Sequence, residues 1–196
     1  MERSTLTKQL IGWSAILTAV AGVIHVWLFP IHMEHAPAHG LFFLLVGIAQ
    51  IVWGVAVWRT PSLKLYYIGA VMAGWLILLY GITRWLPAPF SHGAEAVEPI
   101  DIVCKFCEVL GMITLCILIF QGLILHADRS IAWRAIAGIV VVSFLASFVT
   151  YGVARAAEPI LPWLSSSEDE HHDEIVPSSK EDHQHEDSIP TAEHDR

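Results

Sequence analysis

Long apolar stretches separated by short polar ones dominate the chain up to residue 153. Five stretches have lengths close to the roughly 20 residues that a helix needs to cross the hydrocarbon core of a bilayer. They cover residues 10–29, 40–58, 63–86, 102–125 and 131–153. Prolines or a charged turn separate them, namely Pro30 and Pro37, Pro61, Pro87 and Pro89, and Asp128-Arg129. Proline lacks the backbone N–H that a continuous helix needs, so it favours a break between spans. The pattern predicts an all-α, polytopic membrane protein with a five-helix bundle over residues 10–164.

Composition and charge agree with this prediction and exclude other classes of protein. Apolar residues make up 55% of the chain and charged residues only 15%, whereas soluble domains carry about 25% charged residues. From Glu168 to the end there are 11 acidic residues and two basic ones, so the net charge of −8 belongs to this segment. We therefore expect residues 165–196 to form a disordered, acidic, His-rich tail. No basic patch favours nucleic acid as a partner.

The basic residues predict the orientation in the membrane. Lys and Arg occur before the first span, between spans two and three, and between spans four and five, but not at 30–38 or 87–101. Because short cytoplasmic loops carry the excess of Lys and Arg, residues 1–9 should be cytoplasmic. An odd number of crossings then places the C-terminal tail outside.

Cysteine labelling in intact cells tests this orientation. In a protein whose three native cysteines are replaced by serine, Ser188→Cys should react with a membrane-impermeant maleimide added outside. Ser4→Cys in the same background should react only after the cells are permeabilised. The opposite pattern would place the tail in the cytosol and overturn the predicted orientation.

Histidines and carboxylates gather at the predicted outer side. His35 and His39 are four residues apart, a spacing that puts two imidazoles on one helix face, as two-His metal sites require. With His25 and Glu34 they form our predicted ligand set for a transition metal of the copper or zinc class. Further candidate ligands are His32, His92 and, in the tail as a capture arm, His171, His172, His183 and His185.

A second group of polar residues falls inside or beside the spans. It comprises Gln50, Arg84, Glu98, Asp101 and Glu108. A charge at the bilayer centre costs about 2.5–3.5 kcal/mol, and Glu108 is too deep in its span to reach water, so it needs a partner or a proton. Two interpretations are compatible: an ion pair of Arg84 with Asp101 or Glu108 that joins spans three and four, and an outward-open cavity that binds an ion, a proton or a cofactor.

A redox role is a further alternative. Cys104 and Cys107 have C-x-x-C spacing near the outer end of a span, as in thiol oxidoreductases that pass electrons to quinone. Such proteins need a second cysteine pair, and the only other cysteine is Cys116. Haem could be held by His25 and His39. No Ser-His-Asp arrangement, P-loop or glycine fingerprint occurs, so the sequence favours a non-enzymatic role.

The segment from His25 to Glu108 resembles a family of small, functionally uncharacterised prokaryotic membrane proteins. The residues that carry the resemblance are His25, Glu34, Gly40-Leu41-Phe42-Phe43, Gln50, Pro61, Thr83-Arg84, Pro87-x-Pro89-Phe90, Glu98, Asp101 and Glu108. His35 and Tyr80 stand where the family pattern has Trp, and the cysteines are not part of that pattern. The resemblance implies a prokaryotic inner (plasma) membrane location and one site formed by the His and carboxylate cluster, but no activity.

The sequence thus predicts a membrane protein that binds or handles a transition metal at its outer face, with the lipid bilayer and the metal as partners. The alternative is an accessory subunit that joins other membrane subunits and whose polar cluster is structural.

Overall fold

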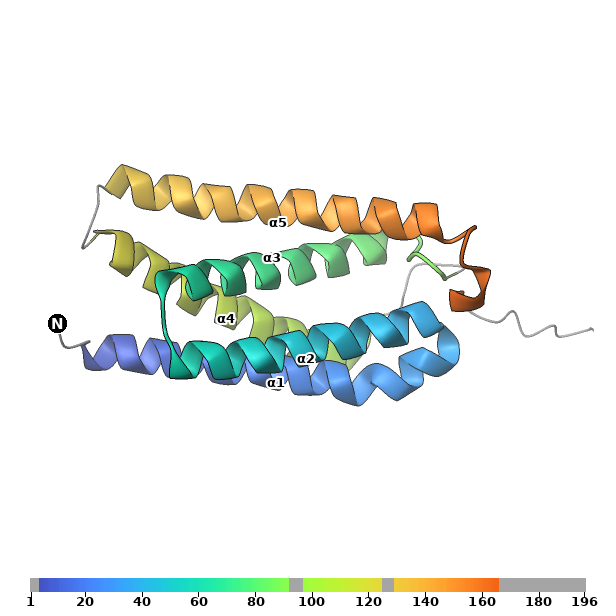
Figure 1. Ribbon diagram of the computed structural model, residues 1–196, viewed down its shortest axis with the longest axis horizontal. Helices are drawn as coiled ribbons and strands as arrows, with labels where there is room; N and C mark the ends of the chain where they lie inside the picture. The colour runs from blue at the N-terminus through green and yellow to red at the C-terminus, as the bar shows by residue number, and fades with distance from the viewer. Residues whose placement is uncertain (1–3, 92–96, 125–128, 166–196) are drawn as a thin grey trace, which may run out of the picture.

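The computed structural model describes residues 4–91, 97–124 and 129–165. Every long element in these ranges is an α-helix, and the helices run side by side in one elongated bundle (Figure 1). They are α1 Thr5–His35, α2 Pro37–Arg59, α3 Leu63–Trp85, α4 Pro99–Ile124 and α5 Arg129–Ala157, followed by the 3-10 helix η1 Pro162–Leu164. All five long helices are apolar and long enough to cross a membrane, which confirms the predicted all-α fold with five spans. The tail from residue 166 onwards and His92 lie outside the described residues.

The first helix is longer than the sequence predicts. Prolines are tolerated inside membrane-spanning helices, and α1 continues through Pro30 to His35. The break comes at Ala36, because the residue before a proline is driven out of the helical region, and its φ of −152° is extended. Pro37 then begins α2 at a position where no intrahelical donor is required. The predicted loop 30–38 is therefore reduced to one residue.

The first two helices approach closely because glycines face each other. A Cβ atom placed on Gly22 would lie 2.7 Å from the carbonyl oxygen of Gly47, and one placed on Gly47 would lie 2.7 Å from the carbonyl oxygen of Gly22. Small residues allow two helix backbones to pack together in a membrane, where lipid is as apolar as the side chains. The contact between α1 and α2 is the most extensive in the bundle.

The fourth helix ties the bundle together, since it contacts α1, α3 and α5 (Figure 1). The apolar core lies toward the end where α1 begins, and includes Ile11, Trp53, Tyr66, Leu115 and Ile139. We call the opposite end, where Ala36 joins α1 to α2, the histidine end. On the outside of the bundle α5 exposes large apolar side chains such as Val140 and Leu145, a surface suited to contact with lipid.

Candidate metal centre

Three helices contribute to a chain of polar side chains buried near the middle of the bundle. His25 on α1, Gln50 on α2 and Glu108 on α4 are 4%, 1% and 2% exposed. Nδ1 of His25 lies 2.9 Å from Oε1 of Gln50, and Nε2 of Gln50 donates to Oε1 of Glu108 at 3.0 Å. Gln50 therefore bridges the imidazole and the carboxylate.

The bridge determines which nitrogen of His25 carries the proton. Because the amide NH₂ of Gln50 is turned to the carboxylate, its carbonyl oxygen faces the imidazole and accepts a hydrogen bond from Nδ1–H. Nε2 of the neutral ring then keeps its lone pair. This nitrogen lies 3.9 Å from Oε1 of Glu108.

A cysteine completes a set of three donor atoms. Cys104 and Glu108 are four residues apart on α4, so their side chains share a face of the helix. Sγ of Cys104 lies 3.9 Å from each ring nitrogen of His25. The ligand atoms of His25, Cys104 and Glu108 all lie within 4.8 Å of one another. Among the described residues, these three form a group of metal-ligand side chains that could hold an ion.

Two ion pairs balance the charges around this group. Lys105 Nζ donates to Oε2 of Glu108 at 2.5 Å, so both carboxylate oxygens are bonded. Nη2 of Arg84, near the end of α3, donates to Oδ2 of Asp101 at 3.1 Å. The Tyr80 ring lies beneath both cations, with its centroid 4.3 Å from Cζ of Arg84 and 5.2 Å from Nζ of Lys105. The pairing lowers the cost of placing charge within apolar helices.

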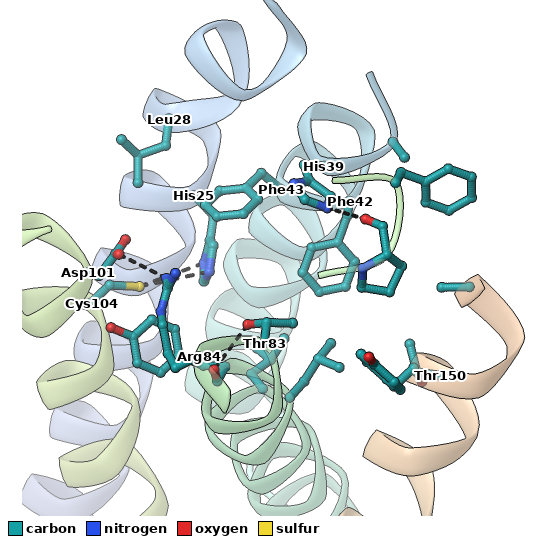
Figure 2. A pocket seen from close by; sticks show the side chains of 18 of the residues that line it. His25, Leu28, His39, Phe42, Phe43, Thr83, Arg84, Asp101, Cys104 and Thr150 are labelled. Atoms are coloured by element: carbon teal, nitrogen blue, oxygen red, sulfur yellow. Dashed lines mark hydrogen bonds and ion pairs between the residues drawn. The ribbon is translucent and has the colours of Figure 1, made fainter. Parts of the chain in front are cut away.

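A cavity of about 240 Å³ adjoins the donor group. His25 and Cys104 form part of its wall, beside the Arg84–Asp101 pair, as Figure 2 shows. Phe43 of α2 packs edge-on against the His25 ring, with 5.2 Å between the ring centroids, and Phe42 lies beside it on the cavity wall (Figure 2). The donor group is thus next to open space.

The structure places the sequence-predicted site residues in two sets. His25, Gln50, Glu108, Arg84 and Asp101 lie together in the network just described. The backbone N–H of Glu98, which is exposed, donates to Oδ2 of Asp101. Cys104 joins the donor group, whereas Cys107 is half-buried and outside it, and both are free thiols.

The other predicted ligands on α1 and α2 point elsewhere. His32 and His35 bond through Nδ1 to carbonyls one turn back on α1, those of Leu28 and Ile31, at 3.0 and 2.7 Å. His39 Nε2 lies 2.6 Å from the carbonyl oxygen of Pro89, and Glu34 is exposed. The donor group of the described residues therefore contains His25 of the predicted ligand set, but not Glu34, His35 or His39.

Sequence reasoning did not find Cys104 as a partner of His25. The signal available was the spacing of Cys104 and Glu108, which puts a thiol and a carboxylate on one helical face. Nothing local to the chain indicated that α1 would present His25 to this face, because the two residues are 79 positions apart.

The fold and the site together define a class of protein. It is a five-span helical membrane protein with a His-Gln-Cys-Glu network buried within the bundle. No protein-family model, curated protein or solved structure matches the chain.

Proposed function

We propose that the protein binds a transition metal ion, of the zinc or copper class, through His25 Nε2, Cys104 Sγ and a carboxylate oxygen of Glu108. The observation that carries the proposal is the convergence of an imidazole, a thiol and a carboxylate within 4.8 Å in a buried position. Nitrogen, sulfur and oxygen donors from these residue types are those that bind zinc, and three protein ligands leave a fourth position open.

The separations of the donor atoms suit such an ion. With bond lengths of about 2.0–2.1 Å to nitrogen and oxygen and about 2.3 Å to sulfur, tetrahedral ligands lie about 3.3–3.6 Å apart. The His25–Glu108 and Cys104–His25 distances are both 3.9 Å. These two pairs would close around the ion with a contraction of a few tenths of an ångström, and the third pair, Cys104 and Glu108, lies within 4.8 Å. Side-chain rotation would supply the movement.

Gln50 supports the same proposal. Histidine ligands usually donate their other ring N–H to an oxygen, and carboxylate ligands accept further hydrogen bonds, which orient both groups toward the metal. Gln50 supplies both interactions from one side chain, because Oε1 bonds to His25 and Nε2 to Glu108. It should therefore act as a positioning residue for two ligands at once.

Cobalt substitution of the purified full-length protein tests the proposal. Co²⁺ bound through Cys104 should produce a thiolate-to-metal charge-transfer absorption at a stoichiometry of one ion per chain. The signal separates this site from the tail, which contains histidines and acids but no cysteine. Cys104→Ser should abolish the charge-transfer band, and His25→Ala and Glu108→Gln should weaken Co²⁺ binding at least tenfold.

Cys107→Ser is the matched control, since Cys107 lies three residues further along α4 but outside the donor group. This variant should keep the band and the stoichiometry of the parent protein. Absence of a thiolate–metal band in the parent, or its loss in Cys107→Ser with retention in Cys104→Ser, would refute the proposed ligand set.

A second candidate function is that of a non-enzymatic accessory subunit whose polar network is structural. It is favoured by the closure of the network without any ion: Gln50 joins His25 to Glu108, and Lys105 neutralises the carboxylate. This candidate predicts no retained metal. A protein that folds normally but binds no Co²⁺ would establish it over the metal proposal.

We also propose that the histidine end faces the outside of a prokaryotic inner membrane. The support is the distribution of Lys and Arg among the short loops. With this orientation the metal would reach the site from outside the cell.

A further inference from the structure

The cavity at the histidine end is a site in its own right. It occupies about 240 Å³ where α5 separates from the α1–α2 pair, and its lining includes Thr150 and Ala154 of α5 opposite Ala38 of α2. In the described residues α5 contacts α3 and α4 but neither α1 nor α2. Nothing within the described chain fills this space, although the helices around it are otherwise closely packed.

The wall of the cavity has two chemically different parts. One part is apolar and largely aromatic, formed by Phe42, Phe43, Phe90, Leu76 and Leu79. The other part is polar and includes His25, Thr83, Arg84 and Lys105. The hydrogen-bond donors there are the two cations Arg84 and Lys105, which carry several N–H groups each. A ligand that matches both parts has a flat apolar body and oxygen atoms that accept hydrogen bonds.

The charge of the cavity favours a neutral ligand. Arg84 is paired with Asp101 and Lys105 with Glu108, so the two cations at the wall are already balanced. An anion would have to separate one of these pairs, and a buried charge left without its partner is strongly destabilising. A neutral acceptor, such as a carbonyl oxygen, can bond to a donor while the ion pairs stay in place.

The volume limits the size of the ligand. An apolar cavity of about 150 Å³ holds benzene, so about 240 Å³ accommodates one six-membered ring with a few small substituents. A fused multi-ring cofactor such as haem would not fit.

We propose that this cavity binds the ring of a neutral, membrane-soluble quinone, with the ring against Phe42 and Phe43 and its carbonyl oxygens toward the N–H donors of Arg84 and Lys105. The proposal goes beyond the metal function and does not depend on it, because the lining exists without an ion. It concerns binding alone.

Duroquinone, a tetramethylbenzoquinone, is a suitable probe, with full-length protein in detergent after treatment with a metal chelator. Tryptophan fluorescence should be quenched saturably at one site per chain, because Trp75 lies beside the cavity and donates to Thr150. Ala154→Phe, which fills the cavity, should weaken binding at least tenfold. Val153→Phe is the matched control on the adjacent, 64% exposed position, and should bind as the parent protein does.

Ala38→Phe fills the cavity from α2 and provides a second variant if Ala154→Phe does not fold, as judged by helical circular dichroism. In competition with labelled duroquinone, durene has the same four methyl groups as the quinone but no carbonyl oxygens. It should therefore compete at least tenfold more weakly than unlabelled duroquinone does. Equal binding to the filled and control variants would overturn the site. Equal competition by durene, or tighter binding of dodecanoate, would overturn the ligand class.

Discussion

Glu108→Ala is expected to lower the free energy of unfolding by about 3 kcal/mol, because it leaves a buried charge without its partner. The side chain of Glu108 is 1% exposed and accepts from both Lys105 and Gln50. Its removal leaves the Lys105 ammonium, 17% exposed, and the Gln50 amide without their acceptor. Titration of the mixed-micelle protein with a denaturing detergent, followed by circular dichroism, measures the change.

A matched ion pair elsewhere in the chain provides the control. Arg155 and Glu158 are also three residues apart and also 2.5 Å apart, but their side chains are 41% and 28% exposed. Exposed pairs contribute about 0–1 kcal/mol, so Glu158→Ala should change the unfolding free energy by less than about 1 kcal/mol. Equal effects of the two substitutions would mean that the burial of Glu108 has no energetic consequence.

A double-mutant cycle tests whether the loss arises from the uncompensated cation. Lys105→Met in the Glu108→Ala background should recover part of the stability, since the unpaired charge is then gone. Additive losses would show that Lys105 and Glu108 are not energetically coupled. Co²⁺ binding should stay at least tenfold weaker than in the parent protein in both variants, because both lack the Glu108 carboxylate, so recovery of stability alone would separate the ion pair from the proposed ligand role.

Gly22→Ala is expected to destabilise the protein by about 1–3 kcal/mol, the usual cost of overpacking. The new Cβ atom would lie 2.7 Å from the carbonyl oxygen of Gly47, a backbone atom that moves only if α1 and α2 separate. It would also lie 3.0 Å from Cβ of Gln50, so we expect the His25–Gln50 hydrogen bond to weaken. Co²⁺ affinity should fall together with stability.

Gly138→Ala on α5 is the control for this substitution. A Cβ atom at Gly138 meets nothing within 4 Å, and alanine favours a helix by up to about 1 kcal/mol relative to glycine. This variant should therefore be as stable as the parent protein or more so, with unchanged Co²⁺ binding. A similar loss in both variants would show that helix packing at Gly22 is not the cause.

The sequence by itself determined the number of spans and the end of the bundle at which the polar groups lie. Both depend on local properties: a spanning helix is recognised by the length of its apolar run, and the spacing of charged residues within a run sets their depth. The requirement that Glu108 have a partner also follows from its depth alone. Gln50, Arg84 and Asp101 were recognised as members of the polar network for the same reason.

Only the tertiary structure decided which side chains meet. Helices that are apolar on all sides carry no pattern that marks the face turned inward, so the sequence did not reveal that His25 faces Cys104 rather than His39. The rotation and separation of α1, α2 and α4 depend on contacts between distant residues, such as Gly22 with Gly47. The donor group and the cavity beside it exist because of that packing.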